Sequence, residues 1–232
     1  MALNPLSLSK KINIPFKDHN LLVNVFVHRS YLNEHKNFYL PSNERLEFLG
    51  DSVLSLITSV YLFRKFPYLE EGDYTEIKSA VVKTDSLATS AQKLGLSDYL
   101  LLSKGEEKSG GRNNKNILAD SFEALIGAIF LDRSFEEAYR FVCVHLFEKR
   151  LDFIVKNKQY LPSKSKLQEL IQAKFKMMPQ YKVIEQTGPE HRRTFKVGVF
   201  FNGKKLGEGT AKSKKEAEEE AAKKAFENLD RL

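Results

Sequence analysis

The stretch from about Asn116 to Leu131 constrains the fold more than any other part of the chain. It is apolar nearly all round, so a helix formed there must be buried within other structure. The same stretch nevertheless contains Asp120 and Glu123, which lie three residues apart and therefore on one side of the helix. Because an ionised carboxylate buried without a partner costs several kcal/mol, these two acids need a partner inside the domain.

A second predicted helix, from about Asn43 to Phe66, also places acids among apolar residues. Glu44, Glu47 and Asp51 stand at positions i, i+3 and i+7, which span about 60° of arc on a helix. Few basic residues lie near the acids of either helix, and clustered carboxylates are what a hard divalent cation needs. For Glu44 alone, a favourable interaction with the helix dipole is an equally good explanation.

Mg²⁺ fits this pattern better than the alternatives do. A di-iron bundle needs Glu-x-x-His on two helices, and the sequence contains no such pair. The histidines are scattered, so metal-activated water is favoured over histidine acid–base chemistry. Gly50 and Gly127, which lie next to the acids, would let the two helices approach closely.

The rest of residues 1–157 also predicts helices. Helical spacing of apolar residues extends over residues 20–31 and about 135–155, and a further helix is expected from Asp73, where Asp73 and Glu76 suggest a capping box. No stretch alternates with period two over a useful length. We therefore expect an all-α domain over residues 1–157.

The composition changes at residues 157–165, a polar stretch with one proline that is typical of a linker. Residues 1–160 have 21 basic and 20 acidic side chains, whereas residues 161–232 have 16 basic and 10 acidic ones. A second domain over residues 163–232 thus holds most of the net charge of +7, which favours a polyanionic partner there.

This second domain is predicted to be a small α+β domain with the order helix, three strands, helix. Asn202-Gly203 is a strong hairpin signal between the second and third strands, and Ser213 with Glu216 predicts a capping box for the last helix. Lys214 and Lys215 in the first turn oppose the helix dipole, so a phosphate partner would explain them better than local stability does. Solvated surface lysines are the common alternative.

The overall composition is that of a water-soluble globular protein, with 42% apolar and 29% charged residues. The single cysteine, Cys143, excludes an intramolecular disulfide framework. No signal peptide is visible, and the longest apolar run has eight residues, far below the roughly 20 of a membrane helix. We expect a cytoplasmic protein without membrane association.

The segment NERLEFLGDS at residues 43–52 resembles the signature of the ribonuclease III family. The resemblance extends to HRSY at 28–31, EGD at 71–73, KSGG at 108–111 and LADSFEALIG at 118–127. It implies that Glu47, Asp51, Asp120 and Glu123 hold a catalytic Mg²⁺, for which Mn²⁺ is a possible substitute. It also places Glu44 and Glu71 beside the site in catalysis, although Glu71 could equally be structural, because it lies in a turn before a capped helix.

Residues 163–232 resemble a double-stranded RNA-binding domain over their whole length. The loop GPEH at 188–191 and the pair Lys214-Lys215 match motifs of that family. The resemblance implies that Gln168 and His191 contact successive minor grooves and that the two lysines hold phosphates between them. Glu218 stands where a further lysine is often found, which would weaken the phosphate contact.

Together the two resemblances imply a homodimeric Mg²⁺-dependent endoribonuclease with no organic cofactor. It would hydrolyse double-stranded RNA to 5′-phosphate and 3′-hydroxyl ends, in the processing of rRNA and mRNA precursors. Phe48 is either a dimer contact or an ordinary core residue. The alternatives are a non-catalytic RNA-binding protein with a dimerisation domain, against which the intact acid set argues, and a helical DNA-binding protein.

Overall fold

The computed structural model describes residues 4–148, 150–189 and 192–228. The chain divides into two compact units, Met1–Tyr160 and Leu161–Leu232. The first unit is built of helices, and the second combines two helices with a three-stranded antiparallel sheet. The predicted fold class is therefore confirmed.

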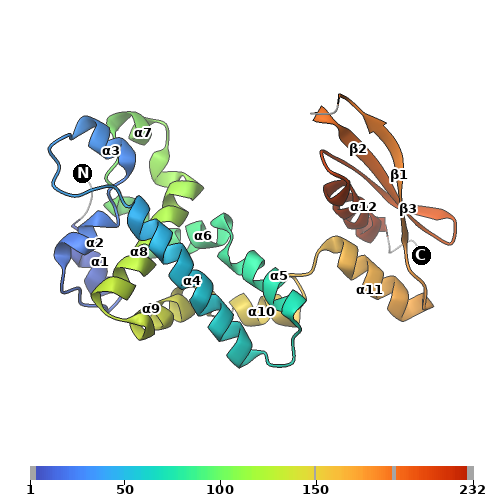
Figure 1. The fold of residues 1–232 in the computed structure, drawn as a ribbon, viewed down its shortest axis with the longest axis horizontal. Helices are drawn as coiled ribbons and strands as arrows, with labels where there is room; N and C mark the ends of the chain where they lie inside the picture. Colours follow the sequence, from blue (N-terminus) through green and yellow to red (C-terminus); the bar gives the residue numbers. More distant parts are fainter. Residues whose placement is uncertain (1–3, 149, 190–191, 229–232) are drawn as a thin grey trace. The chain divides into compact units, whose positions relative to one another are not determined.

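Ten α-helices make up the described part of the first unit (Figure 1). In chain order they are α1 (Leu6–Lys11), α2 (His19–Asn24), α3 (Arg29–Glu34), α4 (Glu44–Lys65), α5 (Glu71–Val82), α6 (Thr84–Leu94), α7 (Lys104–Lys108), α8 (Lys115–Asp132), α9 (Phe135–Val142) and α10 (Arg150–Lys156). Short 3₁₀ turns span Leu96–Tyr99 and Gly111–Asn113, and a π-helical turn spans Cys143–Phe147.

Helix α8 forms the centre of this unit, as its apolar sequence predicts. Its residues 124–129 are all buried, and both α4 and α6 pack against it. Helix α4 is long and apolar enough to be a membrane-span candidate by length and composition alone, with a mean hydropathy of 1.4. Only 39% of its most apolar 18-residue stretch is buried, so much of one face of α4 is exposed in the single chain.

Two glycines allow α4 and α8 to touch backbone to backbone. A β-carbon on Gly50 would lie 1.8 Å from the carbonyl oxygen of Glu123, and one on Gly127 would lie 2.4 Å from the carbonyl oxygen of Leu46. Any larger side chain at either position would push the helices apart. The predicted close approach is thus confirmed, and it brings the acids of the two helices face to face.

Three local predictions were wrong in detail. Residues 20–31 form two helices, because Val27 pairs with Leu101 and His28 caps the new helix α3. The helix predicted over 135–155 is interrupted after the π-helical turn, where Glu148 is extended at ψ 125°. Helix α5 begins at Glu71, two residues early, because Asp73 accepts a hydrogen bond from the backbone of Glu70 at 3.4 Å.

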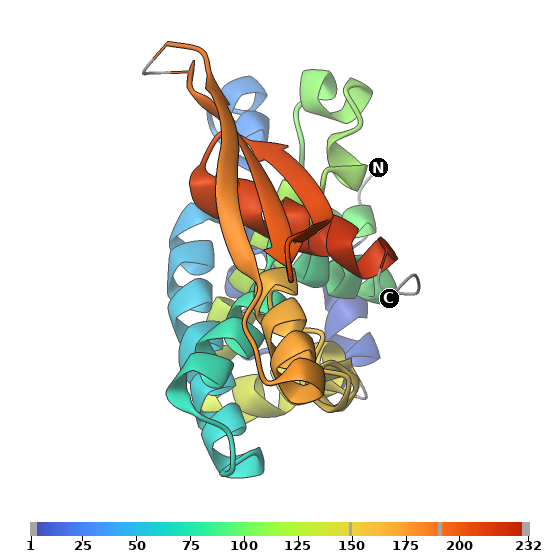
Figure 2. The same ribbon diagram turned by 90° about the vertical axis from the view of Figure 1, so that its right-hand side faces the viewer.

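The second unit consists of α11 (Ser163–Phe175), β1 (Gln180–Thr187), β2 (Thr194–Phe201), β3 (Lys204–Ala211) and α12 (Lys214–Asn228). The strand order is β1-β2-β3, and α12 runs across one face of the sheet (Figure 2). Gly207 on β3 allows this close packing, since a β-carbon there would lie 2.3 Å from the carbonyl oxygen of Ala221 on α12.

The predicted hairpin between β2 and β3 is also confirmed. Asn202 and Gly203 both have positive φ, at 47° and 79°, as a two-residue type I′ turn requires. The turn sets the register in which Phe201 is paired with Lys204.

Candidate active site

Three of the predicted acids converge where α4 meets α8. Ligand oxygens of Glu47, Asp120 and Glu123 lie within 4.8 Å of one another, and all three side chains are half-buried. Asp51, one helical turn after Glu47, is exposed and lies outside this group. Its charge still contributes to raising the pKa of both Glu47 and Glu123.

Burial and mutual repulsion make these three acids, together with Asp51, unfavourable as four free anions. Burial, followed by the charges of Asp51, Asp120 and Glu47, raises the pKa of Glu123 to about 8. Burial and the neighbouring carboxylates likewise raise the pKa of Glu47. Burial raises the pKa of Asp120 too, although the positive charge of Arg29 opposes the rise.

The donor set fits a hard divalent cation. It consists only of carboxylate oxygens, and within the described residues none of these four carboxylates forms an ion pair. A cation of charge two would compensate both the burial and the mutual repulsion that raise these pKa values. The arrangement of these acids therefore provides what Mg²⁺ or Mn²⁺ needs.

Two of the clustered acids, Glu47 and Asp120, line a cavity of about 670 Å³. Glu44 also lines this cavity, where it accepts a hydrogen bond from the Ser42 hydroxyl at 2.6 Å and lies 3.8 Å from Arg29. Glu71 does not line it, and its carboxylate accepts a hydrogen bond from Thr75 at 3.2 Å instead. The residues that line the cavity are His28, Arg29, Ser30, Asn33, Asn43, Glu44, Glu47, Glu106, Asn114, Asn116, Ile117 and Asp120.

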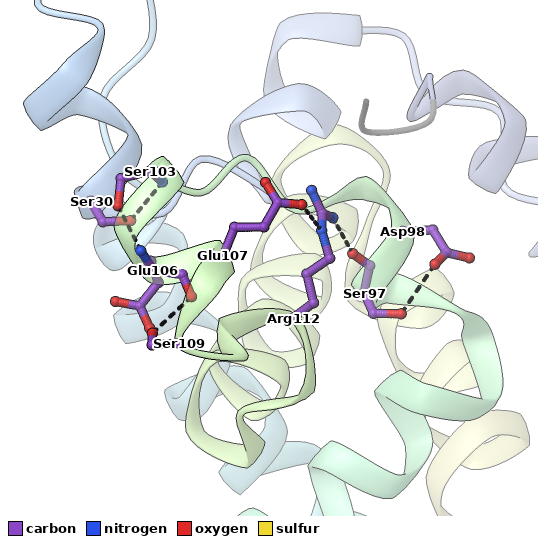
Figure 3. A network of polar contacts seen from close by, with 8 residues as sticks. All are labelled: Ser30, Ser97, Asp98, Ser103, Glu106, Glu107, Ser109 and Arg112. Carbon is purple, nitrogen blue, oxygen red and sulfur yellow. Dashed lines mark hydrogen bonds and ion pairs between the residues drawn. The ribbon is translucent and has the colours of Figure 1, made fainter.

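The segment 103–112, which contributes Glu106 to the cavity lining, is held by a network of polar contacts around α7 (Figure 3). The Ser30 hydroxyl accepts a hydrogen bond from the Ser103 backbone at 3.1 Å, and the Ser103 hydroxyl accepts one from Glu106 at 3.1 Å. Arg112 bonds the Glu107 carboxylate at 2.6 Å and the carbonyl of Ser97 at 2.7 Å. The bond between Ser103 and Ser30 joins this segment to α3.

Sequence reasoning gave no role to three further lining residues, His28, Glu106 and Asn116. A signal was available for Asn116, because it lies four residues before Asp120 and therefore on the acid-bearing face of the same helix. His28 belongs to the HRSY segment of the family resemblance, but only tertiary contacts bring it and Glu106 to the cavity.

The predicted RNA-binding residues lie on the surface of the second unit. Gln168 is partly exposed on α11, and Lys214 and Lys215 are exposed in the first turn of α12. Ser213 caps that helix by accepting a hydrogen bond from Glu216 at 3.2 Å. His191 lies outside the described residues. Glu218 pairs with Lys164 at 2.6 Å, so its charge is partly neutralised locally.

Phe48 is 78% exposed, so it is not a core residue of its own chain. A role in dimer contact stays a prediction.

Comparison with known proteins agrees with this arrangement. Residues 18–150 match the family described as Ribonuclease-III-like, and residues 163–229 match the double-stranded RNA binding motif. The chain is 47% identical to Ribonuclease 3 of Treponema denticola over 97% of its own length and 90% of that protein. It is 44% identical to Ribonuclease 3 of Enterococcus faecalis over 96% of both chains.

Among solved structures, the nuclease domain of ribonuclease III from Campylobacter jejuni is 39% identical, with a TM-score of 0.57. That similarity covers 62% of this chain and 96% of the other. The chain matches both families and is 47% and 44% identical to these two relatives over nearly its whole length. Because it also has the acid cluster, the chain belongs to the ribonuclease III family.

Proposed function

We propose that this protein is a Mg²⁺-dependent endoribonuclease that hydrolyses double-stranded RNA to 5′-phosphate and 3′-hydroxyl ends. The observation that carries the proposal is the convergence of Glu47, Asp120 and Glu123 within 4.8 Å, in a chain of the ribonuclease III family. Mn²⁺ is expected to substitute for Mg²⁺, because both accept carboxylate ligands.

In this mechanism Glu47, Asp120 and Glu123 hold the cation, and Asp51 completes its acidic surroundings. A bound divalent cation supplies Lewis-acid stabilisation of the phosphoryl oxygens and lowers the pKa of a water molecule. Glu44 lines the cavity and lies 3.8 Å from Arg29, and it is proposed to position that arginine for contact with the RNA backbone.

The second unit supplies most of the affinity for the RNA duplex. Its match to the double-stranded RNA binding motif and its excess of basic residues support this assignment. Gln168 and His191 are proposed to contact minor grooves, while Lys214 and Lys215 bind phosphates.

The uncovered face of α4 is proposed to bind a second copy of the chain. Phe48, Leu56 and Phe63 are 78%, 55% and 72% exposed, and their spacing places them on one side of the helix. The similar nuclease domain from Campylobacter jejuni is described as having structural flexibility in a region involved in dimer formation. A homodimer would bury this apolar stripe, here called the α4 stripe and defined by these three residues.

We further propose that the protein acts in the cytoplasm, in rRNA and mRNA precursor processing, without an organic cofactor or a membrane. The lone cysteine, the charged composition and the family membership support these assignments.

One assay tests the proposed function directly. Matched RNA and DNA duplexes are incubated with the protein and either Mg²⁺ or a chelator. Only the RNA duplex with Mg²⁺ should be cut, and end-labelling should find a 5′-phosphate. Cleavage of both duplexes, or cleavage in the presence of the chelator, would contradict the proposal.

A further inference from the structure

The cavity beside the acid cluster is lined by two chemically different sets of side chains. Glu47 and Asp120 belong to the acid cluster. His28, Asn114 and Asn116 are polar side chains that also line the cavity, and they are here called the amide wall. The proposed metal chemistry uses only the acids, so the amide wall has no role in it.

The hydrogen bonds of His28 determine which of its nitrogens carries the proton. Its Nδ1 accepts a hydrogen bond from the Ser30 backbone N–H at 3.3 Å and lies 2.8 Å from the Ser30 hydroxyl. The Ser30 oxygen already accepts a bond from Ser103, so its own hydrogen can point to Nδ1. Nδ1 is therefore unprotonated, and a neutral His28 carries its proton on Nε2, as a donor without a protein partner among the described residues.

Asn116 also has unused hydrogen-bonding groups. Its backbone N–H donates to the Asn114 side chain at 2.9 Å, but within the described residues its own side-chain amide has no protein partner. It lies one turn before Asp120 on the same face of α8, where β-carbons four residues apart are about 5–6 Å from one another. A group bound beside the scissile phosphate would thus come within reach of this amide.

The charge of the cavity favours a neutral group over a second phosphate. Among the described residues, four carboxylates line the cavity, from Glu44, Glu47, Glu106 and Asp120, against the single guanidinium of Arg29. A second phosphate on the amide wall would be repelled, whereas a hydroxyl would not. A ribose 2′-hydroxyl both donates and accepts hydrogen bonds, and a side-chain amide can match both roles.

We propose that Asn116 and the Nε2–H of His28 hydrogen-bond a ribose 2′-hydroxyl next to the scissile phosphate. The nuclease unit would then distinguish RNA from DNA at the cleavage site, in addition to the shape recognition by the second unit. This inference rests on the proposed function, because it requires the scissile phosphate at the acid cluster.

A double-mutant cycle between protein and substrate tests this inference. Single-turnover cleavage by the full chain is measured with Mg²⁺ on an all-RNA duplex and on duplexes with one 2′-deoxynucleotide, moved stepwise through the positions flanking the cut. For the wild type, one position should slow cleavage by roughly three- to tenfold for each hydrogen bond lost. For Asn116→Ala, that same position should cause a clearly smaller loss, because only the bond from His28 remains to be removed.

Asn113→Ala is the matched control. Asn113 is also exposed, three residues away, but it does not line the cavity, so this variant should keep the wild-type pattern. Thermal unfolding of Asn116→Ala should match that of the wild type, because the side chain is exposed.

Two results would overturn the inference while leaving the proposed function intact. One is a wild-type enzyme insensitive to deoxy substitution at every flanking position. The other is an Asn116→Ala variant whose defect is equal on all duplexes, which would indicate a phosphate contact. No cleavage of the all-RNA duplex by the wild type would instead refute the proposed function, and this inference with it.

Discussion

At the scale of single residues, Glu123 shows the conflict between burial and charge most clearly. It lies on the most apolar helix, and its pKa is raised to about 8 by burial and by three neighbouring carboxylates. A protein gains nothing in stability from such a group. Its presence is explained by the cation that the cluster is proposed to hold.

We expect Glu123→Gln to lower cleavage of double-stranded RNA by at least about 100-fold, because the charge that holds the cation is removed while the size is kept. Binding of the duplex, measured without cleavage, should stay close to wild type. Glu136→Gln, which changes an exposed acid on α9, serves as the control and should cleave normally. Near wild-type cleavage by Glu123→Gln over a range of Mg²⁺ concentrations would exclude Glu123 as a ligand.

The same pKa predicts a coupling between pH, stability and metal. Between about pH 4.5 and 8 the folded metal-free protein keeps a proton on Glu123 that the unfolded chain has lost. The free energy of unfolding should therefore fall as the pH rises through this window. Because cation binding displaces this proton, it becomes easier at higher pH.

Thermal unfolding with and without saturating Mg²⁺ measures this coupling. The rise in Tm caused by Mg²⁺ should be larger at about pH 8.5 than at about pH 6. In Glu123→Gln the pH dependence of that rise should be much weaker. An equal rise at both pH values in the wild type would contradict the assignment.

At the scale of elements, the contact between α4 and α8 builds the site. Gly50→Ala would place a β-carbon 1.8 Å from the Glu123 carbonyl oxygen, which is backbone and cannot move aside alone. We expect a loss of stability of about 1–3 kcal/mol or more, and a loss of cleavage because the acids separate. Gly72→Ala on α5 is the control, since its β-carbon would meet nothing within 4 Å. Equal unfolding curves for Gly50→Ala and wild type would refute this view of the contact.

The first turn of α12 is proposed to bind RNA phosphates through Lys214 and Lys215. Replacing both Lys214 and Lys215 with alanine should weaken binding to every RNA duplex. Each lost phosphate contact contributes roughly 0.9 to the slope of log affinity against log salt, so the slope should flatten by about one to two. Lys223→Ala, an exposed lysine later on α12, should change the slope less. An unchanged slope in the double variant would indicate that both lysines are ordinary solvated surface residues.

At the scale of the whole molecule, the α4 stripe predicts a dimer that forms without RNA. Sedimentation at micromolar concentration should give about twice the chain mass of 26.6 kDa. Phe63→Glu should shift the protein to monomer, because a charge would replace a buried contact. Phe153→Glu is the control, as Phe153 is also exposed, at 55%, but lies on α10 outside the stripe. A wild-type protein that sediments only as a monomer would contradict the proposal.

The sequence by itself determined the features that depend on neighbours along the chain. Helical spacing placed Glu47 and Asp51 on one face and Asp120 and Glu123 on another, and Asn202-Gly203 specified its own turn. The apolar residues around the acids also indicated that these carboxylates need a positively charged partner in any fold.

Only the tertiary structure decided which residues from distant parts of the chain lie close together. The contact of two helix backbones leaves Asp51 outside the group that Glu47 forms with α8, and the pairing of Val27 with Leu101 divides a predicted helix in two. The same packing brings His28 from the start of α3 and Glu106 from α7 to the cavity that Asn116 lines. Spacing along one helix follows from its repeat, whereas a distance between remote segments depends on how every intervening element packs.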